Sequence, residues 1–114
     1  MSRRVKTLWI RPEALAQILA GRKTVEVRVG YANIRRLRPG DLLRLNDQHL
    51  YTIERTGRYA SFEEMLAHEK ACAIAPGLES QQVLALCREI YPPEKESLGI
   101  VTLQVLPVAG KELT

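Results

Sequence analysis

Residues Gly21 to Arg28 read Gly-Arg-Lys-Thr-Val-Glu-Val-Arg. Valines alternate here with polar residues, and this period of two predicts a β-strand. The valines are expected on one face of the strand, and Thr24, Glu26 and Arg28 on the other. Gly21 stands where a C-cap glycine is expected, which predicts that a helix ends just before it.

The polar residues of this strand have two interpretations. A hydroxyl, a carboxylate and a guanidinium beside Lys23 form the floor of a polar site, or they belong to an ordinary solvated strand face. In the second case Glu26 and Arg28 are a surface ion pair, and such a pair contributes only about 0–1 kcal/mol.

The whole chain has the composition of one globular domain, residues 1–114. Of its 114 residues 46% are hydrophobic and 26% charged, which argues against disorder. No apolar run approaches the roughly 20 residues that span a bilayer, and the apolar residues after the basic start are too few for a signal peptide. We therefore expect a cytoplasmic protein with no membrane partner.

The cysteines and histidines predict neither a metal site nor a cofactor. Cys72 and Cys87 fit no metal-ligand spacing, and His49 and His68 lie far apart in the sequence. In a reducing compartment the two cysteines are expected to be small core residues.

Charge is unevenly distributed. Through Arg58 there are 13 Lys and Arg against 5 Asp and Glu, a balance of +8, whereas the rest of the chain carries 4 against 8, a balance of −4. A basic half suggests a partner that carries phosphates, because Lys and Arg release counterions when they neutralise phosphate groups. The alternative is that the arginines are scattered and form no patch.

The first half predicts short strands and one helix. Pro12 and Glu13 fit the first turn of a helix that runs to about Ala20. Asn46-Asp47-Gln48 is expected to join the two strands of a hairpin, and Trp9 is expected in the core. The predicted strands and turn are Lys6–Ile10, 25–29, Leu42–Leu45, His49–Arg55 and the turn Arg38–Asp41.

The second half predicts two helices and a last strand. Ser61 begins a capping box, so that a helix follows and directs Phe62, Met65 and Leu66 inward. Ser80 is expected to cap a second helix, which the prolines after Tyr91 stop. The last strand is Leu98–Leu106, and 94–96 is expected to be a solvated loop. Short, numerous strands favour a small α+β barrel.

The residues resemble a known family. The pattern Gly-x-Lys-x-x-Glu-x-Arg follows a predicted helix and precedes a Pro-Gly-Asp turn, and a late Ile-Tyr-Pro segment precedes the last strand. Together these features are similar to the ASCH domain, a relative of the PUA domain, and the resemblance covers nearly the whole chain. It rests on Gly21, Lys23, Glu26, Arg28, Pro39, Gly40, Asp41 and Tyr91.

The resemblance implies an α+β fold and a site. The fold would be a PUA-like β-barrel of about five to six strands, with two to four short helices packed at its side and a cleft beside the motif strand. The family is associated with RNA and nucleoside recognition. One branch resembles acetylcytidine amidohydrolases, which use a lysine and a threonine of this strand and a separate glutamate. Lys23 matches the lysine, Glu26 replaces the threonine, and Glu69 is a candidate for the glutamate.

The site residues have distinct expected roles. Arg28 presents a fork suited to phosphate or carboxylate, and Glu26 suits the exocyclic amine of a base. Lys23 is expected to hold a phosphate, and Arg22 is expected to contact the nucleic acid or other ligand. Tyr91 offers a stacking surface at a helix exit, although it fits a core position equally well.

Three functions follow from these residues. We expect a module that binds RNA, a nucleoside or a nucleotide through Lys23, Glu26 and Arg28, with Arg22 and Tyr91 assisting. The alternative is a small hydrolase, acetylcytidine amidohydrolase-like or a ribonuclease, in which Lys23 is the base and Thr24 or Glu26 assists. The third is a protein-interaction domain. The sequence does not indicate an oligomeric state.

Overall fold

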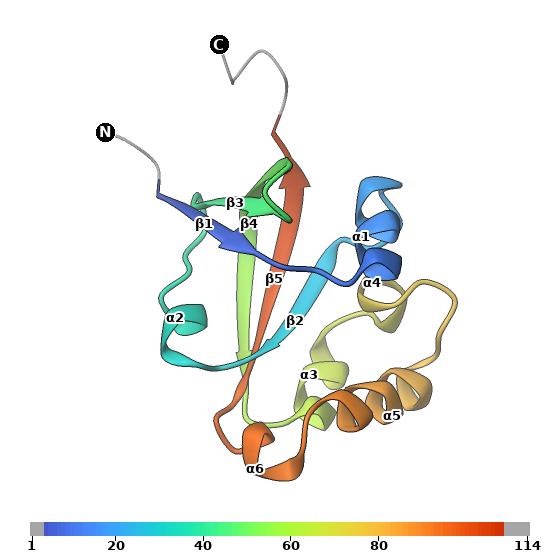
Figure 1. Cartoon of the computed structure of the whole chain (residues 1–114). Helices are drawn as coiled ribbons and strands as arrows, with labels where there is room; N and C mark the ends of the chain where they lie inside the picture. Colours follow the sequence, from blue (N-terminus) through green and yellow to red (C-terminus); the bar gives the residue numbers. More distant parts are fainter. Residues whose placement is uncertain (1–3, 109–114) are drawn as a thin grey trace.

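A computed structural model describes residues 4–108, which form one curled sheet with helices packed alongside (Figure 1). The sheet has five strands in the order β1-β3-β4-β5-β2. The β1 and β3 strands are parallel, and the other neighbours are antiparallel. The strands are β1 Val5–Leu8, β2 Val25–Val29, β3 Leu42–Leu45, β4 His49–Tyr59 and β5 Ile100–Pro107. The predicted α+β, PUA-like architecture of five to six strands is therefore confirmed.

The described residues contain six helices rather than the predicted two to four. The additional helices α2, α4 and α6 have one turn each, and so short a segment leaves no periodic pattern in a sequence. The predicted loop at 94–96 was wrong, because Pro93 starts α6. The helices are α1 Pro12–Leu19, α2 Ala32–Arg35, α3 Phe62–His68, α4 Ala71–Ile74, α5 Ser80–Ile90 and α6 Pro93–Glu96.

The helix caps confirm one prediction and correct another. The Ser61 side chain accepts a hydrogen bond from the Glu64 backbone N–H at the start of α3, as predicted. The cap of α5 is Glu79 instead of Ser80. The Glu79 side chain accepts from the Gln82 backbone N–H, and the Gln82 side chain accepts from the Glu79 backbone N–H. This reciprocal capping box satisfies two of the backbone donors at the start of the helix.

The hairpin that joins β3 and β4 is as predicted, but β4 is longer than expected. Asn46 and Asp47 have φ values of 52° and 61°, as the two central residues of a type I′ turn require, and the Gln48 N–H closes this turn on the Leu45 carbonyl at 3.0 Å. The register of β4 against β5 shifts between Ile53 and Arg55, which marks a β-bulge. The bulge changes the alternation of side chains, so the strand continues to Tyr59 although the alternation in the sequence predicts an end at Arg55.

Hydrophobic side chains form two cores, one on each face of the sheet. Inside the curl, Leu43, Ile53 and Leu103 are almost fully buried. On the other face, Phe62 and Met65 of α3 pack with side chains of α5 against the valines of β2. The prediction for Trp9 was wrong, because its side chain is 64% exposed.

The cysteines differ from each other. Cys87 is buried in the helical core, as predicted, whereas Cys72 is exposed. Neither forms a disulfide. Burial raises the pKa of the Cys87 thiol to about 11.

β2 lies at the edge of the sheet. β2 is the last strand in the sheet order, so only one of its two edges is paired, with β5. Gly21, with φ of 79°, turns the chain between α1 and this strand, as the C-cap prediction requires. The unpaired edge of β2 faces the space between α1 and α5 (Figure 1).

Candidate functional site

Side chains of β2 alternate between the two cores, as the sequence predicts. Val25 and Val29 are buried in the helical core. Glu26 and Arg28 lie opposite Leu103 and Val101 of β5, which belong to the core inside the curl. The two polar side chains are therefore at the rim of this inner core, on the edge strand.

Lys23 is buried and fully engaged. Its side chain is only 8% exposed. The Nζ atom donates to the carbonyl oxygens of Val25, at 2.8 Å, and Ile74, at 2.7 Å, and lies 3.2 Å from Glu26 Oε1. These three oxygen atoms match the three donors of an ammonium group. Lys23 thus fastens α4 to the start of β2.

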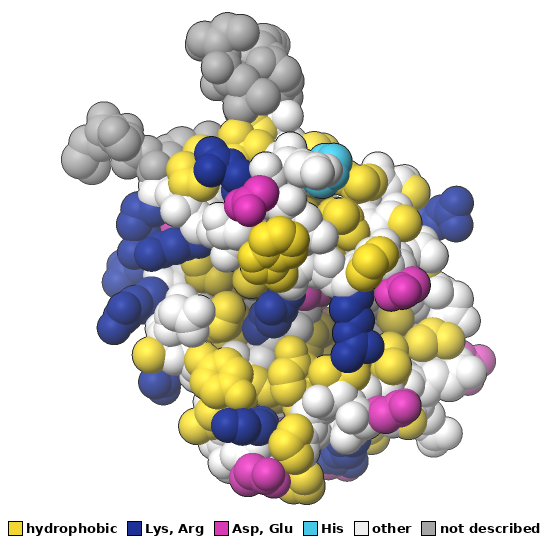
Figure 2. Space-filling model, in the orientation of Figure 1, with side chains coloured by type: hydrophobic (Ala, Val, Ile, Leu, Met, Phe, Trp, Pro, Cys, Tyr) yellow, Lys and Arg dark blue, Asp and Glu magenta, His cyan; other side chains and the backbone are white. Residues whose placement is uncertain are grey.

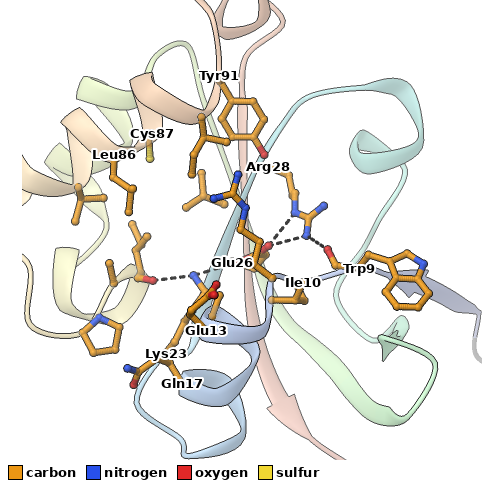
Figure 3. A pocket seen from close by; sticks show the side chains of 18 residues that line it. Trp9, Ile10, Glu13, Gln17, Lys23, Glu26, Arg28, Leu86, Cys87 and Tyr91 are labelled. Atoms are coloured by element: carbon orange, nitrogen blue, oxygen red, sulfur yellow. Dashed lines mark hydrogen bonds and ion pairs between the residues drawn. The ribbon is translucent and has the colours of Figure 1, made fainter.

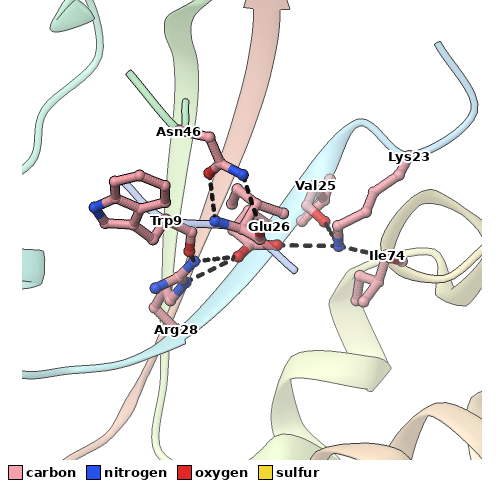
Figure 4. Close-up of polar contacts among 8 residues, drawn as sticks. Trp9, Lys23, Val25, Glu26, Arg28, Asn46 and Ile74 are labelled. Carbon is pink, nitrogen blue, oxygen red and sulfur yellow. Dashed lines mark hydrogen bonds and ion pairs between the residues drawn. The ribbon is translucent and has the colours of Figure 1, made fainter. Parts of the chain in front are cut away.

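Glu26 connects Lys23 to Arg28 in a chain of ion pairs (Figure 4). Both Nε and Nη2 of Arg28 lie 2.8 Å from Glu26 Oε2. Arg28 Nη2 also donates to the Trp9 carbonyl oxygen at 2.6 Å. The side chains of Glu26 and Arg28 are 12% and 23% exposed, so this pair is not an exposed surface ion pair. The Nη1 atom of Arg28 has no hydrogen bond within residues 4–108.

Asn46 fixes the segment that carries Trp9. Its side-chain amide accepts from the Ile10 backbone N–H at 2.7 Å and donates to the Ile10 carbonyl at 2.9 Å (Figure 4). The hairpin turn thereby holds the chain between β1 and α1 in place. The sequence analysis treated Asn46 only as a turn residue, because a contact across 36 positions leaves no local signal.

The ion-pair chain lines a cavity of about 510 Å³, here called the β2 cavity. This volume is within the range of small-molecule sites. Its walls come from α1, β2 and α5, and Figure 3 shows Glu13 and Gln17 on one side, Leu86 and Cys87 on another, and Tyr91 across from Lys23. Polar groups therefore lie on the β2 and α1 sides, and the α5 wall is mostly apolar.

A smaller cavity adjoins the β2 cavity. It has a volume of about 290 Å³ and is lined by residues of β1, β2 and α2. Trp9, Arg28 and Tyr91 line both cavities. The bond from Arg28 to the Trp9 carbonyl thus lies at their boundary, and the Trp9 indole extends beyond Arg28, away from Lys23 (Figure 3).

Two residues that the sequence analysis did not single out add polar groups to the β2 cavity. Gln17 Oε1 is buried and has no hydrogen-bond partner among the described residues. Arg11 is exposed at the cavity. The first offers an acceptor and the second a positive charge to a bound molecule.

Basic side chains gather beside the smaller cavity. Arg4 Nη2 donates to the Arg36 carbonyl at 2.6 Å, and Arg58 Nη2 donates to the Arg35 carbonyl at 2.5 Å. The side chains of Arg4 and Arg58 therefore contact the backbone at the end of α2, and Arg4 is also paired with Asp41 at 2.7 Å. We call these two residues, with Arg35 and Arg36, the α2 patch. Figure 2 shows Lys and Arg side chains along the side of the molecule where β1 and α2 lie, and others beside the central hollow.

The structure brings together only some of the predicted site residues. Lys23, Glu26, Arg28 and Tyr91 all line the β2 cavity. The Tyr91 ring stacks on Phe62 with centroids 6.0 Å apart, and burial raises the pKa of its hydroxyl. Arg22 is exposed, Thr24 is half-buried, and neither lines the cavity.

Glu69 lies in a separate cluster, which we call the Glu69 cluster. Its carboxylate accepts two hydrogen bonds from Arg55, at 2.7 and 3.0 Å, one from the Tyr59 hydroxyl at 2.7 Å and one from the Thr102 hydroxyl at 2.8 Å. Hydrogen bonding to Arg55, which outweighs burial, lowers the pKa of Glu69 from 4.5 to about 2. Glu69 does not line the β2 cavity.

A glycine permits the close packing of this cluster. A Cβ atom at Gly57 would lie 2.5 Å from Thr102 Oγ1 and 2.9 Å from Glu69 Oε2. Neither distance leaves room for a side chain, so Gly57 is required by the approach of these two groups.

Comparison with known proteins identifies the family. The family model of the ASCH domain matches residues 8–107, almost the full length of the described chain. The chain belongs to the ASCH domain family. The β2 cavity and its ion-pair chain are thus features of an ASCH domain, and the resemblance noted from the motif and the turn is confirmed.

Two solved structures resemble this ASCH domain. The crystal structure of the hypothetical protein PH0355 superposes with a TM-score of 0.85 at 25% identity, over 91% of this chain and 99% of the other. The solution NMR structure of protein PF0455 from Pyrococcus furiosus gives a TM-score of 0.75 at 25% identity, over 91% and 97%. No curated protein matches the chain.

Two kinds of feature are absent from the described part of this ASCH domain. Within residues 4–108, no three His, Cys, Asp or Glu side chains are grouped so that they could hold a metal ion. No described helix has the length and apolar character to cross a bilayer.

Proposed function

We propose that this ASCH domain binds single-stranded RNA, with one nucleotide in the β2 cavity. The observation that carries the proposal is the ion-pair chain of Lys23, Glu26 and Arg28 on the wall of a cavity of about 510 Å³. Ligand cavities of this kind combine apolar walls with a few fixed polar groups. Lys23 and Glu26 fix Arg28, whose Nη1 atom is available to an oxygen of the ligand.

The adjoining cavity and the α2 patch favour a ligand longer than one nucleotide. Trp9, Arg28 and Tyr91 connect the β2 cavity to the smaller cavity, which Asn33 and Ile34 of α2 border. From there the α2 patch continues a path of positive charge. Proteins that bind single strands combine such a basic path with aromatic side chains, on which bases stack.

The experiment is a titration of ¹⁵N-labelled protein with nucleoside 5′-monophosphates and with short single-stranded RNAs, at low salt. We expect amide shifts in residues 23–28 and around Tyr91, with RNA binding more tightly than any mononucleotide. Added salt should weaken the binding of RNA, because phosphate contacts release counterions. The absence of shifts at millimolar ligand would refute the proposal.

A pair of variants separates the site from general charge attraction. Arg28→Gln removes the free donor in the cavity and should weaken RNA binding about tenfold, which corresponds to about 1.4 kcal/mol. Arg44→Gln removes the same charge from an exposed position on β3 that lines neither cavity, and it should have little effect. Equal losses in both variants would mean that binding is not centred on the β2 cavity.

Hydrolysis with Lys23 as base is the alternative proposal, and the geometry supports it less. A base needs a lone pair, and all three donor positions of Lys23 face oxygen atoms. Thr24 does not line the cavity, and Glu69 is held in its own cluster. We expect no turnover of acetylcytidine or RNA; turnover abolished by Lys23→Ala would favour the hydrolase instead.

A further inference from the structure

The unpaired edge of β2 presents backbone groups to the β2 cavity. The Val105 N–H donates to the Thr24 carbonyl, and the Gly30 N–H donates to the Gly99 carbonyl. Between these two contacts the register pairs Glu26 with Leu103 and Arg28 with Val101, so the backbone groups of Glu26 and Arg28 also point to β5. Successive residues of a strand point their backbone groups to opposite sides. Those of Val25, Val27 and Val29 therefore point away from β5.

Two of these three residues already have partners for their carbonyl groups. The Val25 carbonyl accepts from Lys23 Nζ at 2.8 Å, and the Val29 carbonyl accepts from the Tyr31 N–H at 2.8 Å. Val27, between them, lines the β2 cavity. Neither its N–H nor its C=O has a partner within residues 4–108. Val27 thus offers a donor and an acceptor side by side on one residue that lines the cavity.

We propose that Val27 reads the hydrogen-bonding edge of a nucleobase. Its N–H would donate to a ring nitrogen or carbonyl oxygen of the base, and its C=O would accept from the adjacent amino or imino group. Every nucleobase has such a neighbouring acceptor and donor on its pairing edge. This inference rests on the proposed function and deepens it, because it names the atoms that hold the base.

A planar base fits this edge better than an added peptide strand does. A strand that extends a sheet forms hydrogen bonds with several successive outward-facing residues. Here Lys23 and Tyr31 occupy the carbonyl groups on both sides of Val27, so Val27 alone of the three outward-facing residues keeps both its N–H and its C=O for a ligand. The apolar side chains of Val83 and Leu86 on the opposite wall suit the faces of a ring.

The test compares nucleotides with analogues whose pairing edge is altered. Adenosine monophosphate is titrated beside its 1-deaza analogue, which lacks the ring acceptor, and uridine monophosphate beside its 3-methyl analogue, which lacks the imino donor. We expect the altered analogue to bind about tenfold more weakly, as the loss of one hydrogen bond predicts. The Val27 amide proton should move downfield only with the unaltered nucleotides.

Two variants of Val27 provide an independent test. Val27→Pro removes the outward N–H, a change that an edge strand accommodates because that N–H has no ladder partner. Val27→Ala shortens the same side chain but keeps both backbone groups, so it should bind nucleotides more tightly than Val27→Pro does. We expect loss of binding in Val27→Pro alone, with the amide spectrum of β5 unchanged.

The outcomes separate this inference from the proposed function. Equal binding of altered and unaltered nucleotides overturns the role of Val27 but leaves nucleotide binding in the β2 cavity intact. Binding of no nucleotide and no RNA overturns both. If Val27→Pro fails to fold, the comparison of analogues on the parent protein still decides.

Discussion

The β2 cavity and the Glu69 cluster each contain a glutamate paired with an arginine, but the first pair faces a cavity and the second is enclosed by hydrogen bonds. The two pairs lie on opposite faces of the sheet. Thr102, which donates to Glu69, is the cross-strand neighbour of Val27, and Val27 and Glu26 point to opposite faces because they are adjacent on β2. The Glu69 carboxylate accepts four hydrogen bonds, and Gly57 allows them to close around it.

The ion-pair chain of β2 is left open instead. Lys23, Glu26 and Arg28 hold one another, yet a cavity faces them and Arg28 retains a free donor. The comparison suggests that the closed cluster stabilises the fold and that the open one binds a ligand. Mutations test this difference, because a variant of either cluster can be measured for both its stability and its ligand binding.

Removal of the closed carboxylate should have the largest effect. Glu69→Ala leaves the buried Thr102 hydroxyl and the Tyr59 hydroxyl without their acceptor and the Arg55 charge without its partner. We expect the free energy of unfolding to fall by about 3 kcal/mol, measured by urea denaturation. Glu63→Ala, at an exposed position of α3, the helix that Glu69 follows, should cost less than about 1 kcal/mol.

Acid should weaken the same cluster. The pKa of Glu69 is lowered in the folded state to about 2 from an ordinary 4.5, so its contribution to stability is complete above pH 4.5 and is lost as the pH falls toward 2. Asp41, whose pKa is also lowered by hydrogen bonding to Arg4, adds to the effect. Glu69→Gln should therefore lose less stability than the parent protein over this range; identical slopes would contradict the assignment.

The exposed tryptophan should affect binding and leave stability unchanged. Trp9 is 64% exposed and lines both cavities, so Trp9→Ala should change the free energy of unfolding by less than about 0.5 kcal/mol. Loss of one stacked base should weaken RNA binding by about 1–3 kcal/mol. Because the indole points away from Lys23, mononucleotide binding should fall less than RNA binding does.

Fluorescence anisotropy of labelled RNA measures the effect at Trp9. Leu106→Ala is a suitable control, since Leu106 is exposed on β5 and lines neither cavity. Equal binding by Trp9→Ala and the control would restrict the ligand to the β2 cavity.

The smallest expected effect is on stability at the open cluster. Arg28→Ala leaves Glu26 with Lys23 as its partner, so the free energy of unfolding should fall by no more than about 1 kcal/mol. Arg55→Ala removes the charge that faces the buried Glu69 and should cost about 2 kcal/mol. Thermal denaturation of both variants side by side gives the difference. A larger loss for Arg28→Ala would mean that the open cluster is structural too.

Local patterns predicted the elements that build the site. The alternation in 25–29 predicted β2 and the faces of its side chains, Gly21 predicted the end of α1, and Ser61 predicted the start of α3. Each of these signals lies within one turn or one strand, where side-chain periodicity and backbone conformation are set by neighbouring residues.

Other features had no local signal. The apolar segment around Trp9 predicted a buried side chain. Trp9 is exposed because it follows β1 at the edge of the curled sheet. The one-turn helices are too short for a periodic pattern, and the bulge before Arg55 concealed the length of β4.

The sequence by itself determined the α+β class, the family and a strand with Glu26 and Arg28 on one face, because these depend on short-range periodicity and on a motif with its turn. Only the tertiary structure decided that Lys23 is saturated by oxygen atoms, that Glu69 lies in a closed cluster and that Val27 has unpaired backbone groups. Those properties depend on sheet order and on contacts between distant segments, since the same strand placed inside the sheet would have neither an open edge nor a cavity beside it.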